Sequence, residues 1–150
     1  MFEHDYVNYP ELTNTQLNDF GFASPHQQIV ADFRATVIRV HDGDTVTLRT
    51  TFRDFDFPLR FLDIDSKELN EGGEGAREWL KNKIEGQQVT ILIDSQNRVG
   101  KYGRLLGKVF FNGMDVGEEE LYLGLAVPFG SKKEGEVDNT GKTFSLKQWF

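Results

Sequence analysis

Alternating apolar and polar positions mark several segments of the chain as strands. Residues 33–51, FRATVIRVHDGDTVTLRTT, are rich in Val, Ile and Thr, with one break at Asp42-Gly43. This pattern predicts a two-stranded hairpin, because Gly accepts the positive φ that a tight connection demands. Residues 56–65, DFPLRFLDID, predict a third strand, with Pro58 near an edge or a bulge. Two further strands are predicted over residues 89–94 and 104–111.

A helical period follows the third strand. In residues 74–86, EGAREWLKNKIEG, the positions Ala76, Leu80 and Ile84 fall on one face of a helix, and Gly86 is a stop signal. Three strands, a helix, two strands and a further helix are the order of an OB-type barrel. We therefore expect an α+β fold, mainly β: a five-stranded Greek-key barrel with one helix between strands 3 and 4 and one C-terminal helix.

Two shorter patterns predict the remaining helices. Residues 117–126, GEEELYLGLA, are acidic at their start and apolar at their end, which predicts the C-terminal helix closing near Gly124. The acidic run 118–120 is expected at the solvated start of this helix, with one alternative left open, that Glu120 falls on a normally apolar position. Near the N-terminus, the segment PELTNTQLNDFG predicts a short helix that begins at Pro10 and ends before Gly21.

Composition divides the chain into three regions. Residues 1–32 form a polar, acidic N-terminal extension, residues 33–128 the barrel domain, and residues 129–150 a C-terminal tail that is partly mobile. The first 33 residues contain neither Lys nor Arg and no long apolar run, so no signal peptide is predicted. We expect a cytoplasmic monomer with no membrane partner.

Most of the net charge of −7 comes from residues 1–33. All five charged residues among residues 1–33 are acidic, whereas residues 34–128 carry 13 basic and 16 acidic side chains. Overall acidity argues against a protein that coats nucleic acid, because nonspecific affinity comes from neutralising many phosphates. It does not argue against a site that processes a few phosphates. The chain has no Cys, which excludes disulfides and zinc–thiolate sites.

Three polar blocks carry the candidate chemistry. DGDT, residues 42–45, is typical either of a turn or of two carboxylates that bind a divalent cation. RFLDIDSKE, residues 60–68, places Arg60 at the parity of the apolar residues two and four positions on, so we expect it on the inward side of the barrel, where it needs an anion. NRVGKYGR, residues 97–104, is a loop that brings Lys, Tyr and Arg to the start of a strand.

These three blocks, in this order, resemble staphylococcal nuclease and the thermonuclease family of SNase-like OB-fold domains over about residues 34–127. The resemblance implies a calcium-dependent phosphodiesterase that cuts DNA and RNA with low base specificity and leaves 3′-phosphate ends. The implied Ca²⁺ ligands are Asp44, Asp65 and the backbone carbonyl of Ser66, with Asp42 just outside the ligand shell. The implied catalytic residues are Arg60, Glu68 and Arg104, and the implied substrate-binding residues are Lys101 and Tyr102.

Some positions depart from the pattern of that family. Ser66 stands where Thr is common, which a backbone carbonyl ligand tolerates. Lys67 stands where Pro is common and adds a positive charge beside Glu68. Phe129 could replace a Tyr that stacks on the substrate base.

Phosphodiester hydrolysis gives the blocks a physical logic. Water must attack a centre surrounded by negative oxygens, so fixed cations have to meet the added charge. Two guanidiniums and a metal held by oxygen ligands do this, and such ligands favour calcium or magnesium over zinc. An alternative is a noncatalytic barrel that binds single-stranded nucleic acid or a protein partner. A third hypothesis is that the acidic residues 1–33 cover the basic face and restrain activity.

Overall fold

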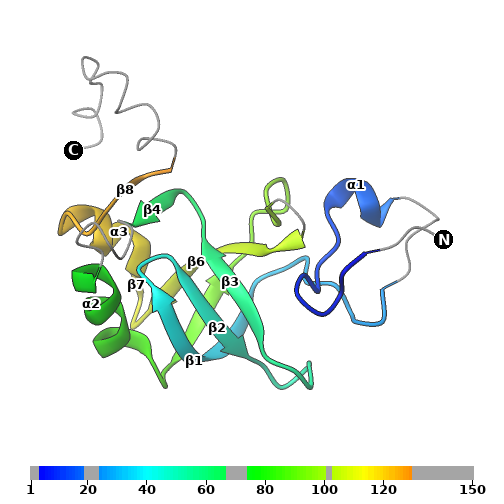
Figure 1. Ribbon diagram of the computed structural model, residues 1–150, viewed down its shortest axis with the longest axis horizontal. Helices are drawn as coiled ribbons and strands as arrows, with labels where there is room; N and C mark the ends of the chain where they lie inside the picture. Colours follow the sequence, from blue (N-terminus) through cyan, green and yellow to red (C-terminus); the bar gives the residue numbers. More distant parts are fainter. Residues whose placement is uncertain (1–3, 19–23, 67–73, 101–102, 130–150) are drawn as a thin grey trace, which may run out of the picture.

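A computed structural model describes residues 4–18, 24–66, 74–100 and 103–129 (Figure 1). In chain order the elements are α1 (Asn14–Leu17), β1 (Phe33–Asp42), β2 (Thr45–Arg49), β3 (Phe57–Phe61), β4 (Ile64–Ser66), α2 (Glu74–Ile84), β5 (Gln88–Leu92), β6 (Leu105–Phe111), β7 (Met114–Asp115), α3 (Val116–Tyr122) and β8 (Ala126–Pro128). The main sheet has the order β3-β2-β1-β5-β6-β7, and a parallel pairing of β3 with β6 closes it into a barrel. The predicted five-stranded OB-type barrel of the α+β class is confirmed.

The first hairpin forms as predicted, but its turn is different. Asp42 still belongs to β1, so the two turn residues are Gly43 and Asp44. The φ angle of Gly43 lies outside the left-handed region, and the prediction of a positive φ is wrong. A Cβ on Gly43 would lie 2.6 Å from the Cβ of Ser66 and 2.8 Å from the Cβ of Ala76. Glycine is needed here because β4 and α2 approach the turn closely.

The predicted third strand is two strands. β3 ends at Phe61 and β4 begins at Ile64, with a turn in which Asp63 has a φ of 71°. β3 buries every other residue from Phe57 to Phe61, so Arg60 faces outward. The predicted inward orientation of Arg60 is wrong, because the turn breaks the alternation between Arg60 and the buried Ile64.

α2 and α3 cover one end of the barrel (Figure 1). The buried face of α2 is the predicted one, Ala76, Leu80 and Ile84. α3 is capped by the Asp115 carboxylate, which accepts a hydrogen bond of 3.1 Å from the amide of Glu118. After α3, a short strand that was not predicted, β8, pairs with β4. None of the helices in the described part of the chain is long and apolar enough to cross a membrane.

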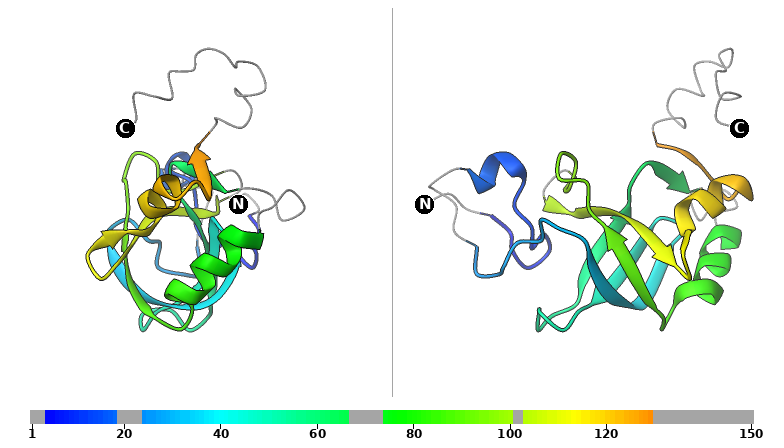
Figure 2. Two further views of the ribbon diagram at one scale, coloured as in Figure 1. Left: turned by 90° about the vertical axis from the view of Figure 1, so that its left-hand side faces the viewer. Right: turned by 180° about the vertical axis from the view of Figure 1, so that it is seen from behind.

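Residues 4–18 and 24–32, called here the N-terminal segment, pack against the other end of the barrel. Figures 1 and 2 show this segment and the helices α2 and α3 on opposite sides of the strands. Leu12 and Ile29 are buried, and Ile29 belongs to the hydrophobic core of the barrel. α1 covers only Asn14–Leu17, capped by Thr13, so the predicted helix beginning at Pro10 is too long.

Candidate active site

Arg60 bridges two of the predicted metal ligands. Its Nη2 donates a hydrogen bond to the Asp65 carboxylate and lies 3.5 Å from Oδ2 of Asp44. The three side chains are only 12–17% exposed. The β1–β2 turn, the end of β3 and the strand β4 therefore converge on one charged cluster, as the order of the sequence blocks implies.

Several hydrogen bonds fix the position of Asp44. The amide of Ser66 donates to Oδ2 of Asp44 at 2.9 Å, and the hydroxyl of Thr45 donates to Oδ1 at 3.1 Å. The amide of Phe61 donates to the Asp44 carbonyl at 2.8 Å. The backbone of Asp44 thus joins the hairpin to β3, and its carboxylate joins the hairpin to β4.

Asp42 and Asp44 have opposite electrostatic tendencies. Burial and the hydrogen bond with Asp44 raise the pKa of Asp42 above its ordinary value. Burial also acts to raise the pKa of Asp44, but hydrogen bonds from Asp42 and the Ser66 amide, together with the charge of Arg60, outweigh it and lower that pKa. Of the two carboxyl groups, Asp44, the residue predicted to bind a cation, is therefore the stronger acid.

Glu120 is a fourth carboxylate beside this cluster. It belongs to the acidic run expected at the solvated helix start, and it occupies the normally apolar position that was the alternative for it. It has no solvent exposure, and neither of its oxygens accepts a hydrogen bond from a residue that the structure describes. Its Oε1 is 3.1 Å from where a Cβ of Gly43 would lie. Burial and the negative charges of Asp44 and Asp42 raise the pKa of Glu120 to about 9. The one sequence signal was its helical spacing of four from Val116, which is buried.

Arg104 and Phe129 belong to segments next to Arg60. Arg60 is opposite Leu106 in the β3–β6 pairing, and Arg104 immediately precedes β6. The guanidinium carbon of Arg60 lies 5.2 Å from the centroid of the Phe129 ring, which is 65% exposed. An exposed aromatic ring thus lies beside Arg60, one of the two arginines that the family resemblance assigns to catalysis.

Three predicted site residues lie outside the described residues: Glu68, Lys101 and Tyr102. The neighbouring Lys67 does so too.

The oxygen atoms of this cluster suit a hard divalent cation. Within residues 4–18, 24–66, 74–100 and 103–129, no group of three or more His, Asp or Glu side chains could hold a metal ion. The implied set is of another kind, since it has two carboxylates and one backbone carbonyl. Asp44 and Asp65 share one cationic group, Arg60, which places their carboxylate oxygens close together. The donor chemistry therefore fits calcium or magnesium.

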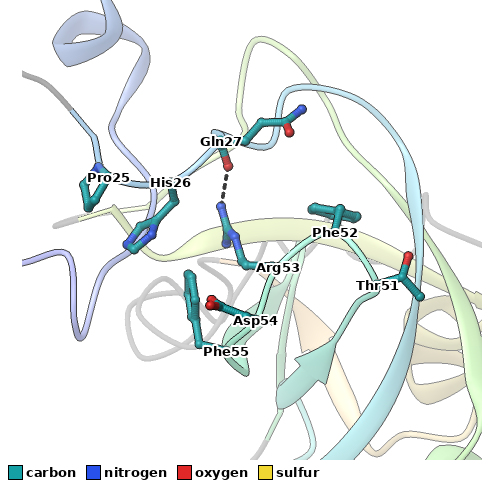
Figure 3. Close-up of a pocket in the computed structure, with 8 residues that line it drawn as sticks. All are labelled: Pro25, His26, Gln27, Thr51, Phe52, Arg53, Asp54 and Phe55. Atoms are coloured by element: carbon teal, nitrogen blue, oxygen red, sulfur yellow. Dashed lines mark hydrogen bonds between the residues drawn. The ribbon is translucent and has the colours of Figure 1, made fainter.

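A separate pocket of about 350 Å³ lies between the N-terminal segment and the β2–β3 connection (Figure 3). It is lined by Pro25, His26, Gln27, Thr51, Phe52, Arg53, Asp54 and Phe55. Asp44 precedes the first residue of β2, whereas Thr51–Phe55 follow its last. The pocket and the charged cluster therefore lie at opposite ends of this strand.

Comparisons with known proteins bear on the charged cluster. The family model described as staphylococcal nuclease homologue matches residues 58–146. An "Uncharacterized endonuclease" of Escherichia coli O157:H7 is 30% identical over 100 residues, which are 65% of this chain and 62% of the relative. A "Micrococcal nuclease" of Shigella flexneri is 37% identical over 84 residues, 53% of this chain and 44% of the relative. The "SPbeta prophage-derived endonuclease YokF" of Bacillus subtilis (strain 168) is 33% identical over 98 residues, 61% of this chain and 32% of the relative. The matched part of the chain spans less than two thirds of the length of each relative.

Proposed function

Because the chain belongs to the family of staphylococcal nuclease homologues, we propose that it is a calcium-dependent nuclease that hydrolyses DNA, RNA or both with low base specificity. The observation that carries this proposal is the guanidinium of Arg60 held between Asp44 and Asp65. The family match and the relatives named as nucleases support the same class of reaction.

The oxygen ligands of the cluster support the cation. Two carboxylates approach the same guanidinium, which gathers the hard oxygen ligands that calcium prefers at one point. Asp44, Asp65 and the carbonyl of Ser66 would hold the calcium ion. When bound, the ion supplies positive charge next to the oxygens of the scissile phosphate.

The protein groups then divide the remaining work. The β3–β6 pairing brings the backbone of Arg104 near that of Arg60. Both arginines donate paired hydrogen bonds to phosphoryl oxygens, which opposes the negative charge that builds as water adds. Glu68 accepts the proton of the attacking water. The bond from phosphorus to the 5′ oxygen breaks, so the products carry a 3′-phosphate and a 5′-hydroxyl.

A cleavage assay on denatured DNA and on RNA tests the proposal. Wild type is compared in calcium and in chelator with Arg60→Ala and Glu68→Gln. Loss of one phosphate-binding donor should lower kcat on the order of 10²-fold to 10³-fold. Arg49→Ala is the matched control, because Arg49 is an exposed arginine paired with Asp56 away from the cluster. Equal cutting by wild type and Arg60→Ala would refute the catalytic role.

The products separate nuclease action from the noncatalytic alternative. New 5′-hydroxyl ends accept labelled phosphate from polynucleotide kinase without prior phosphatase treatment. Retarded migration of intact oligonucleotide without any cutting in calcium would favour a binding module.

A further inference from the structure

The loop between β5 and β6 is tied to the N-terminal segment at three points along residues 95–104. At its start, the side-chain amide of Asn14 donates a hydrogen bond of 2.9 Å to the carbonyl of Ser95. In the middle, Arg98 enters the segment. At the end, Gly103 touches it. This loop leads directly into Arg104, one of the two proposed phosphate-binding arginines.

Arg98 is the central tie. Its side chain is 2% exposed, and its guanidinium donates to the carbonyl of Ile29 at 2.8 Å, to the carbonyl of Leu12 at 2.6 Å and to the Glu11 carboxylate at 3.0 Å. These partners come from both halves of the N-terminal segment. A planar guanidinium with several fixed donors can bind them together, which a lysine cannot do. The segment is therefore folded around a side chain of the loop.

Gly103 makes the second close contact. Its φ is +97°, and a Cβ on it would lie 2.2 Å from the carbonyl oxygen of Glu11 and 3.2 Å from a ring carbon of His4. Only glycine permits this approach of backbone to backbone. The N-terminal segment thus abuts the residue immediately before Arg104.

Hydrogen bonds within the loop connect these contacts to the backbone of Arg104. The amide of Gly100 donates to the carbonyl of Arg104 at 2.7 Å, and the amide of Leu106 donates to the carbonyl of Arg98 at 2.9 Å. Leu106 is the residue opposite Arg60 in the parallel pairing of β3 with β6. A displacement of Arg98 would therefore move the backbone that carries Arg104 relative to Arg60.

We propose that the N-terminal segment holds the β5–β6 loop in its substrate-binding position, with Arg98 as the positioning residue. The inference rests on the proposed function, since that function assigns Arg104 to the substrate. It goes beyond it by making residues 4–18 and 24–32 a working part of the site. The inference also contradicts the hypothesis that the acidic N-terminal residues restrain activity. Glu11 pairs with Arg53 and Arg98, and not with the proposed phosphate-binding arginines.

Arg53 provides a matched control within the same cluster. Its Nη2 lies 2.6 Å from the other oxygen of Glu11, and its side chain is 3% exposed. It also donates to the carbonyl of Gln27 at 2.7 Å (Figure 3). Arg53 follows β2, however, and is not part of the β5–β6 loop. Removing either arginine breaks a buried ion pair with Glu11. Of the two arginines, however, only Arg98 belongs to the loop and connects it to the N-terminal segment.

The experiment compares full-length Arg98→Met and Arg53→Met at a temperature where circular dichroism shows both variants to be folded. Hydrogen exchange of the backbone amides of residues 99–106 reports on the loop, and kcat and KM on denatured DNA in calcium report on the site. We expect Arg98→Met to lose protection in the loop and to lower kcat/KM on the order of tenfold to a hundredfold, since small misplacements of binding groups have effects of that size. Arg53→Met should keep loop protection and stay within about twofold of wild type.

The outcomes separate this inference from the proposed function. Equal losses of kcat/KM in both variants would mean general destabilisation and would overturn the inference, as would normal kcat/KM in Arg98→Met. If wild type does not cut nucleic acid at all, the proposed function fails, and the positioning of a substrate-binding loop fails with it even where the exchange data show a tied loop. A faster Arg98→Met enzyme would favour restraint by the N-terminal segment and contradict the inference.

Discussion

Two glutamates are buried to the same degree at opposite ends of the barrel, in contrasting surroundings. Glu11 is 1% exposed and lies between two guanidiniums, with Oε2 2.6 Å from Arg53 and Oε1 3.0 Å from Arg98. It also accepts a hydrogen bond of 2.8 Å from the amide of Ile29. Glu120 has no exposure, stands beside Asp42 and Asp44, and accepts no hydrogen bond from the described part of the chain.

The difference separates structural stability from function. A buried charge with opposite charges and hydrogen bonds around it holds two distant segments in place, although an apolar replacement of the whole cluster could be as stable. A buried carboxylate without partners destabilises the fold, because its desolvation is not compensated. Groups with strongly shifted pKa values are common at functional sites. The end of the barrel with Glu120 is also the end where we propose the active site.

The largest effect is expected for Glu11→Ala. The substitution leaves Arg53 and Arg98 buried beside each other without their common anion, and breaking a buried pair in this way costs about 3–5 kcal/mol. Urea denaturation should show this loss in the free energy of unfolding. Glu118→Ala is the control, since Glu118 is exposed and such surface changes stay within about 0.5 kcal/mol. A loss as small as that of the control would mean that Glu11 does not anchor the N-terminal segment.

Replacement of Glu120 should have the opposite sign. Glu120→Leu removes a buried polar group of similar size, so the free energy of unfolding in chelator should rise by about 1–3 kcal/mol. Glu118→Leu, the same change at an exposed position of α3, should not stabilise the protein. Destabilisation by Glu120→Leu would show that Glu120 is compensated by a partner.

The pH dependence of stability should distinguish the same residue. The pKa of Glu120 in the folded protein is about 9, whereas an ordinary Glu in the unfolded chain titrates near 4.5. Because the folded pKa is raised, the protonated carboxyl contributes full stability below about pH 4.5, and this contribution is lost as the pH rises towards 9. The slope attributable to Glu120 is at most about 1.4 kcal/mol per pH unit.

Urea denaturation of wild type and Glu120→Gln, both in chelator between pH 5 and pH 9, measures this slope. The difference in stability between the two proteins should shift steadily in favour of Glu120→Gln as the pH rises. A difference that does not change with pH would contradict the raised pKa. The outer limits of this range follow from the pKa values just given.

Local patterns in the sequence predicted much of the barrel and part of the cluster. The strands, α2 and its buried face follow from periodicity. The blocks around Asp44, Arg60 and Asp65 meet because β2 pairs with β3, with Thr45 opposite Arg60, and β4 follows β3 directly. The orientation of Arg60 was wrong, since a single residue of positive φ, Asp63, reset the alternation. Periodicity cannot reveal such a turn when no glycine marks it.

The contrast between the two glutamates could not be predicted, because it depends on distant contacts. Arg53 and Arg98, the partners of Glu11, are 42 and 87 residues away in the sequence. The sequence alone therefore predicted only a polar N-terminal extension. Glu120 lies in an acidic run and its neighbours in space come from the first hairpin. Gly43 lies in the predicted turn, but the close packing of Ser66 and Ala76 requires the glycine there, and not a positive φ.

The smallest effect is expected where an ion pair is exposed. Arg49 and Asp56 form a two-pronged pair at 2.8 and 2.9 Å, as short as the contacts of Glu11, but the Arg49 side chain is 61% exposed. Water and salt screen such a pair, so Arg49→Ala should scarcely shift the urea midpoint. Any shift should vanish in about 0.5 M salt, where the screening length is only a few ångströms. Glu11→Ala should keep its full effect in the same salt, because its partners are buried. A salt-sensitive Glu11→Ala, or a salt-resistant Arg49→Ala, would show that burial does not separate the two kinds of ion pair.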